Sequence, residues 1–100
     1  MKTTEAQISK LIAQLAKLAG MSNNKMSAIE AGREFYLSYE NAPVYGGYRL
    51  IMINVKNGSH YGAFGMSSTC PRQKPATFSL MLESLILGLE YAKDHGITTN

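Results

Sequence analysis

The residue types that most often carry out chemistry are few in this chain and widely spaced. It has one cysteine, Cys70, and two histidines, His60 and His95. No cluster of His, Cys, Asp and Glu has the spacing of metal ligands, so we expect no metal and no cofactor. Activation of a Cys70 thiolate needs an adjacent base or a helix N-terminus, and no histidine neighbours Cys70 in the sequence. These residues form no recognisable catalytic set.

Carboxylates that act as acids or bases usually converge from separate elements. Glu40, at the end of a predicted strand, is the only one placed in this way, and the sequence shows no partner for it. We expect His60 to be packed and hydrogen-bonded at the margin of the core, and His95 to cap the last helix. The protein is therefore predicted not to be an enzyme, because catalysis would require Glu40, His60 or Cys70 to converge in a pocket. Three further carboxylates lie on one polar strip of the last predicted helix, as solvated surface charge: Glu83, Glu90 and Asp94.

Cations and tyrosines remain as candidate binding residues. The formal net charge is +3 and the sequence pI is near 9.1, a mild preference for polyanions. Two cations precede the last predicted helix, whose free N–H groups and dipole favour an anion. Lys10 and Lys17 lie on the exposed face of the first predicted helix, and Tyr45 lies in a predicted loop. A phosphate backbone needs several spaced cations, which these could supply; the alternative is that they are ordinary solubilising surface charge. The candidate nucleic-acid-binding residues are Lys10, Gln14, Lys17, Tyr45, Arg72 and Lys74.

Length and composition indicate one folded domain spanning residues 1–100. The chain is 45% hydrophobic and 17% charged, as in ordinary globular domains, and too short for a second domain. A single cysteine excludes an internal disulfide and favours a reducing compartment, so we expect a cytoplasmic protein. No run reaches the roughly 18 apolar residues that a membrane-spanning helix needs, and the N-terminus does not resemble a secretory signal.

Hydrophobic periodicity predicts an α+β fold in the order helix, three-stranded antiparallel meander, helix, with both helices on one face of the sheet. Apolar residues recur every three or four positions in the first segment and alternate in the second. The polar connector 21–32 has room for one helical turn around residues 28–31. The predicted elements are a helix over 4–19, strands over 33–40, 48–56 and 59–66, and a helix over 77–95.

The pair Asn57-Gly58 predicts a two-residue type I′ hairpin between the last two strands. This turn would place Val55 opposite His60 and Ile53 opposite Gly62. The register predicts an apolar core face made of Ile51, Ile53, Val55, Phe64 and Met66. The opposite, mixed face is then expected to point outward, with Tyr48, Leu50, Met52, Asn54, Lys56, Ser59, Tyr61 and Ala63.

The last predicted helix is more apolar than a surface helix needs to be. One apolar stripe consists of Phe78, Met81, Leu82, Leu85 and Leu89. A second stripe contains large and small side chains, and either the first helix or another copy of the chain is expected to cover it. The candidate oligomer interface is Leu80, Ser84, Leu87, Gly88 and Tyr91.

The run from Val55 to Ser68 resembles the second hairpin of the double-stranded RNA-binding domain, which leads into a Gly-x-Gly-x-Ser stretch. The predicted order of elements matches that family over almost the whole chain. In the family, RNA contacts the exposed face of the first helix, the loop between strands one and two, and a lysine cluster at the start of the last helix. Here residues 70–75 replace the lysine cluster and 41–45 replace the family's Gly-Pro-x-His loop. The resemblance implies RNA contacts at Lys10, Gln14, Lys17, residues 41–45, Arg72 and Lys74.

Residues 35–97 also resemble part of the ribonuclease H fold, through 84–92 and the approach to its second strand at 45–48. Enzymes of that fold hold metal ions with carboxylates, whereas the matching positions here are Tyr39 and Met81. This resemblance implies a shortened relative without catalysis.

Two functions remain open. The first is a small non-catalytic module that binds nucleic acid through cations on the first helix and before the last helix. The alternative is a homodimeric protein-interaction or inhibitory factor that acts through the apolar C-terminal helix.

Overall fold

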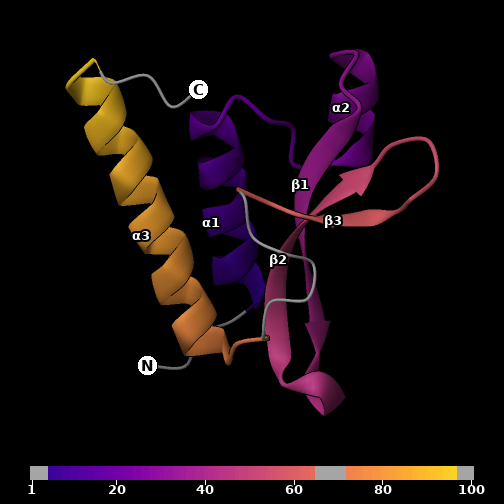
Figure 1. Cartoon of the computed structure of the whole chain (residues 1–100), viewed down its shortest axis with the longest axis vertical. Helices are drawn as coiled ribbons and strands as arrows, with labels where there is room; N and C mark the ends of the chain where they lie inside the picture. Colours follow the sequence, from indigo (N-terminus) through magenta and orange to yellow (C-terminus); the bar gives the residue numbers. More distant parts are fainter. Residues whose placement is uncertain (1–4, 65–71, 97–100) are drawn as a thin grey trace.

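The structure is a computed structural model that describes residues 5–64 and 72–96. Its elements are α1 (Glu5–Leu18), α2 (Lys25–Glu30), β1 (Phe35–Ala42), the 3-10 helix η1 (Pro43–Tyr45), β2 (Gly47–Asn54), β3 (His60–Gly62) and α3 (Pro75–Asp94). The strands form one antiparallel sheet in the order β1-β2-β3, and α1 and α3 lie side by side against it (Figure 1). The predicted α+β class and strand order are confirmed. No helix in the described part of the chain is long and apolar enough to cross a membrane.

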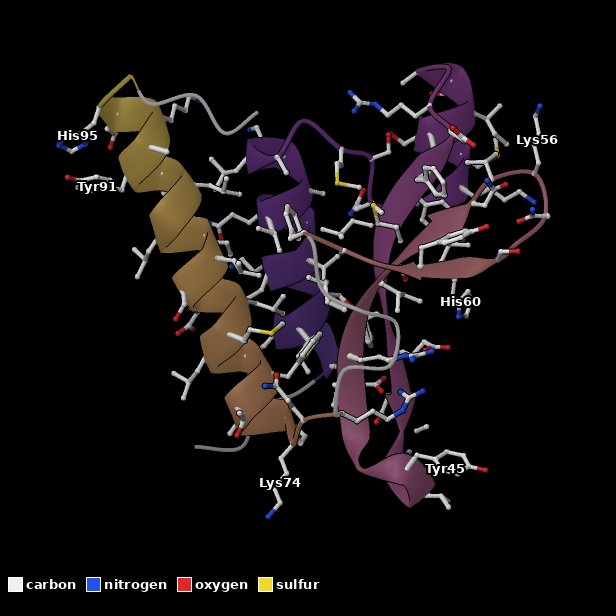
Figure 2. The ribbon with its side chains drawn as sticks, in the orientation of Figure 1. Tyr45, Lys56, His60, Lys74, Tyr91 and His95 are labelled. Atoms are coloured by element: carbon white, nitrogen blue, oxygen red, sulfur yellow. The ribbon has the colours of Figure 1, made fainter. Side chains whose placement is uncertain are left out.

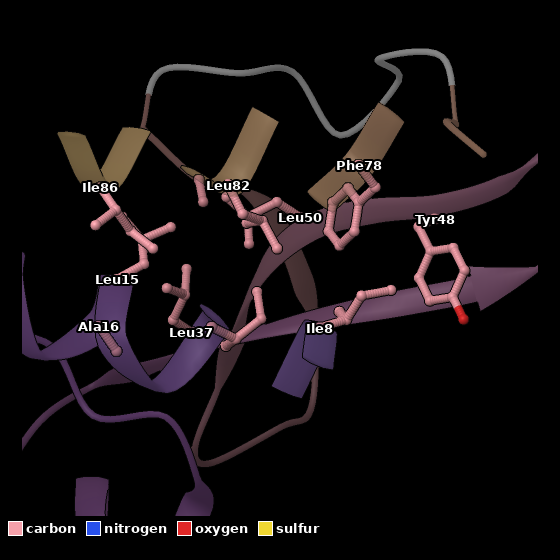
Figure 3. Close-up of a cluster of buried hydrophobic side chains, with 11 residues drawn as sticks. Ile8, Leu15, Ala16, Leu37, Tyr48, Leu50, Phe78, Leu82 and Ile86 are labelled. Atoms are coloured by element: carbon pink, nitrogen blue, oxygen red, sulfur yellow. The ribbon is translucent and has the colours of Figure 1, made fainter. Parts of the chain in front are cut away.

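One hydrophobic core joins α1, α3 and one face of the sheet (Figure 3). Phe78 of α3 is fully buried and stacks on Tyr48 of β2, with ring centroids 5.5 Å apart. Both helices therefore pack on the same sheet face, as predicted. The buried residues of this core are Ile8, Ile12, Leu15, Ala16, Leu37, Tyr48, Leu50, Ala63, Phe78, Leu82 and Ile86.

The core lies on the sheet face opposite to the predicted one. Leu37 pairs with Met52, and Tyr39 with Leu50, so the apolar side of β1 shares a face with Leu50 and Met52. Ile51, on the other face, is also buried, at 1% exposure. Because β2 is apolar on both sides, its own pattern does not select a face, whereas the polar and apolar alternation of β1 does.

The β2–β3 hairpin has a longer loop than predicted. Ile53 pairs with His60, two residues away from the expected register, so residues 55–59 form the loop. Asn54 Oδ1 accepts hydrogen bonds from the N–H groups of Lys56 and Asn57 at 2.9 and 3.2 Å. This side-chain turn replaces the type I′ turn, which requires positive φ at both central residues. Gly58 has φ of +71°, but Asn57 is not among the described residues with positive φ.

The remaining element boundaries shift by a few residues. Strand β3 ends at Gly62, and Phe64 has a positive φ of 54°, which does not continue a ladder. The predicted strand residues 65 and 66 lie outside the described residues. Helix α3 begins at Pro75, two residues early, because proline suits the first helical turn. The connector holds α2, whose N-cap Asn24 accepts a 2.8 Å bond from the Ser27 N–H.

Candidate functional site

The end of the molecule that carries η1 and the start of α3 holds an open cavity of about 370 Å³. Tyr45 projects from η1 into solvent, and Lys74 borders the cavity, both at this end (Figure 2). The walls are mostly apolar or glycine backbone, with one ammonium group. This combination suits a flat, partly apolar ligand that carries negative charge. The lining residues are Asn41, Pro43, Gly46, Gly47, Tyr48, Lys74 and Pro75.

Backbone contacts hold the two walls of this cavity together. Tyr48 and Gln73 exchange two N–H to C=O bonds of 2.7 Å each, which fasten the approach to α3 onto the first residues of β2. Gly47 has φ of +114°, and a Cβ there would overlap the Gln73 carbonyl. Arg72 donates to the Gly47 carbonyl oxygen at 3.2 Å. The close approach of the two segments therefore depends on glycine at position 47.

Tyr48 connects the cavity to the core. Its side chain is buried, and its hydroxyl donates to Glu5 Oε1 at 3.3 Å. Burial and the nearby Glu5 carboxylate raise the pKa of the Tyr48 hydroxyl above its ordinary value. Tyr48 is thus a neutral, fixed wall of the cavity.

Glu40 is the centre of a charged cluster on the outer sheet face. Its carboxylate accepts hydrogen bonds from Arg49 Nε and from Arg72, the latter at 3.3 Å. His60 Nδ1 lies 2.7 Å from Glu40 Oε2. Burial opposes ionisation of Glu40, but the hydrogen bonds and positive charges of Arg49 and His60 outweigh it, so the pKa of Glu40 lies below its ordinary value.

The Glu40 cluster corrects two sequence-based expectations. Glu40 has partners, and His60 is on the outer face rather than at the margin of the core. The signal that sequence reasoning missed is the register itself, which places Arg49 directly opposite Glu40. Arg72 is a candidate binding residue whose guanidinium is already bonded to Glu40 and Gly47. We interpret Arg72 as a structural residue that fastens the segment before α3 to the sheet, and not as a residue that contacts a ligand.

The three candidates on α1 lie apart from the end cavity. Lys10, Gln14 and Lys17 are exposed. Gln14 borders a second cavity, of about 340 Å³, between α1 and α3. Two carboxylates line that cavity, so a phosphate placed at Gln14 would meet negative charge. Its lining residues are Leu11, Gln14, Glu83, Ile86, Leu87 and Glu90.

Lysine side chains supply most of the accessible positive charge. All ion pairs among the described residues converge on Glu40, and none involves a lysine. Every lysine in the described ranges is exposed to solvent. Their charge is therefore available to a polyanion, at Lys10, Lys17, Lys25, Lys56, Lys74 and Lys93.

The candidate oligomer interface lies on the outside of α3. Leu80, Leu87 and Tyr91 are 62%, 67% and 59% exposed. Helix α1 therefore covers the stripe containing Leu82 and Ile86 and leaves the second stripe uncovered. His95 is the C-cap residue, and its Nδ1 donates to the Tyr91 carbonyl at 2.9 Å, which confirms its predicted capping role.

Within residues 5–64 and 72–96, no three His, Cys, Asp or Glu side chains are grouped to hold a metal ion. Cys70 lies outside the described residues. No protein-family model matches the chain, and no curated protein or solved structure is significantly similar to it.

Proposed function

We propose that the chain is a non-catalytic module that binds single-stranded nucleic acid at the end cavity. The observation that carries the proposal is the cavity itself, with apolar walls and Lys74 at its rim. Tyr45 lies on the adjoining η1 and is exposed to solvent. An unstacked base fits an apolar wall or an exposed aromatic ring, and a phosphate pairs with an ammonium group. A cytoplasmic location remains our expectation.

Two observations favour a single strand over a duplex. Recognition of a duplex by this arrangement would need α1 and the approach to α3 to contact phosphates together. Gln14 on α1 borders the carboxylates Glu83 and Glu90, and Arg72 is paired with Glu40. Glu40 and His60 do meet, but neither lines the end cavity or the cavity between α1 and α3, and the Glu40 carboxylate is also bonded to two arginines. We therefore propose binding without catalysis.

Fluorescence anisotropy with a labelled 12-nucleotide single strand, and with the matching duplex, tests the proposal. Tyr45→Ala should raise Kd for the single strand about tenfold, because base stacking on an aromatic side chain contributes roughly 1–3 kcal/mol. Lys74→Ala should reduce the slope of log K against log salt by about one.

Lys93→Ala is the matched control, because it removes one exposed lysine near the other end of α3. It should leave affinity nearly unchanged. Absence of binding at low salt contradicts the proposal, as does an equal loss in Lys93→Ala and Lys74→Ala. Preference for the duplex, with the largest losses at Lys10 and Lys17, would support duplex binding through α1 instead.

A further inference from the structure

The two walls of the end cavity belong to segments that lie far apart in the sequence. One wall comes from residues 41–48, and the other consists of Lys74 and Pro75. The segment that leads into α3 reaches the start of β2 at Tyr48 and Gln73, whose backbone groups exchange two hydrogen bonds (Figure 1). We call this contact the junction. A ligand held by both walls binds more tightly when the junction is already fixed, because less of the site must be ordered on binding.

The Arg72 side chain spans the junction. Its Nη1 donates to the Gly47 carbonyl oxygen at 3.2 Å, and its Nη2 donates to Glu40 Oε1 at 3.3 Å. The side chain is 16% exposed, and it does not line the end cavity. Because a planar guanidinium that bonds two fixed acceptors has little freedom left, Arg72 anchors the residues just before Lys74 to both β1 and β2.

Glu40 is held in place by partners from two further strands. Arg49 lies opposite Glu40 on β2, and its Nε donates to the Glu40 carboxylate. His60 Nδ1, on β3, lies 2.7 Å from the other carboxylate oxygen. The Glu40 carboxylate lies outside the end cavity but is bonded to a side chain that touches its wall at Gly47. Near a site for an anion, such a carboxylate is unfavourable by charge alone.

On the basis of the proposed function, we propose that Glu40 and Arg72 are positioning residues of the end cavity. Together they fasten the segment that carries Lys74 to the first residues of β2, and so raise the affinity of the cavity for a single strand. A carboxylate thereby favours the binding of a polyanion, although neither Glu40 nor Arg72 contacts it. Charge alone predicts the opposite, because loss of the Glu40 carboxylate would remove a repulsion and release Arg72 for a phosphate.

Amide hydrogen exchange on the ligand-free protein tests the junction without nucleic acid. The N–H groups of Tyr48 and Gln73 donate across the junction, whereas the Leu37 N–H is bonded elsewhere. In Glu40→Gln and in Arg72→Gln, exchange at Tyr48 and Gln73 should accelerate about tenfold relative to Leu37, because the junction opens locally. The Leu37 reference corrects for a loss of global stability. Equal acceleration at all three amides, or none, overturns the proposal.

Fluorescence anisotropy at pH 7 with the labelled 12-nucleotide single strand tests the effect on affinity. Glu40→Gln and Arg72→Gln should each raise Kd about fivefold. The double variant should raise Kd no further, because both substitutions release the same segment. The slope of log K against log salt should stay close to the wild-type value, since no phosphate contact is lost. Circular dichroism at the assay temperature checks that each variant is folded.

Glu34→Gln is the charge-matched control, because Glu34 is an exposed carboxylate without an ion pair among the described residues. It should bind as tightly as the wild-type chain. Tighter binding by Glu40→Gln, or a slope reduced by about one in Arg72→Gln, overturns the proposal, since either result assigns Arg72 a direct phosphate contact. Wild-type affinity in both variants overturns it as well. If the wild-type chain binds no single strand at low salt, the proposed function fails, and the exchange rates alone decide whether Glu40 and Arg72 fasten the junction.

Discussion

Glu40 shows how one side chain acquires its role from its neighbours. Three elements supply its partners: Arg49 from β2, His60 from β3 and Arg72 from the approach to α3. Through Arg72, which also bonds the Gly47 carbonyl, the cluster reaches the wall of the end cavity. A carboxylate that looked isolated in the sequence thus links the sheet to the candidate binding site.

Replacement of Glu40 should destabilise the fold in a pH-dependent way. At pH 7, Glu40→Gln should lower the free energy of unfolding by about 1–2 kcal/mol, because it removes charged hydrogen bonds to partly exposed partners. The pKa of Glu40 is depressed in the folded state, so its contribution is fully present above the ordinary value of 4.5 and is lost as pH falls below it.

Urea denaturation of the wild-type chain and Glu40→Gln between about pH 7 and 3 measures this difference. The two curves should converge as the pH falls below 4.5. Glu34→Gln, at an exposed carboxylate with no ion pair among the described residues, is the control. A constant gap between wild type and Glu40→Gln over the whole range would contradict the assigned ionic role.

In the β2–β3 hairpin, hydrogen bonds to the Asn54 side chain outweigh the preference of Asn57-Gly58 for a two-residue turn. Asn57-Gly58 favours a tight turn, but Asn54 satisfies two N–H groups of the loop and moves the register by two residues. A register shift of two residues keeps each side chain on the same face of the sheet, so the longer loop does not change which face is buried. The buried face is selected by the pairing of β2 with β1, whose apolar side chains Leu37 and Tyr39 share a face with Met52 and Leu50.

Asn54→Ala should lower the free energy of unfolding by roughly 1–2 kcal/mol, because the N–H groups of Lys56 and Asn57 lose their acceptor. Asn54 itself is only 8% exposed. Thermal or urea denaturation measures the effect. Lys56→Ala, in the same loop, removes a side chain that makes no hydrogen bond to any described residue, and should change stability by less than about 0.5 kcal/mol. Equal losses of stability in Asn54→Ala and Lys56→Ala would contradict the proposal that the Asn54 side chain stabilises the loop.

At the scale of the whole molecule, the end cavity and the exposed apolar side of α3 are neighbours. Lys74 borders the cavity and immediately precedes α3, and the exposed Leu80 lies less than two helical turns further on. Self-association through α3 would therefore bring a second copy close to the cavity rim.

Self-association should make the melting temperature depend on protein concentration, because only the folded chain dimerises. The alternative function, a homodimer through α3, predicts that wild-type Tm rises by several degrees between about 5 and 500 μM, while Tm of Leu87→Glu stays constant. Differential scanning fluorimetry in the absence of nucleic acid measures this. A concentration-independent wild-type Tm would argue against a dimer in this range.

The class and order of the elements were predictable from the sequence, because helical and alternating periodicities are local properties of the chain. The sequence also singled out Tyr45 and Lys74 and the apolar stripe at Leu80, Leu87 and Tyr91, which the structure leaves exposed. Two features could not be predicted without the three-dimensional structure: the sheet face that is buried, and the contacts of Glu40 with two arginines and a histidine. Those outcomes depend on strand register and on contacts between residues far apart in sequence, which no local pattern contains.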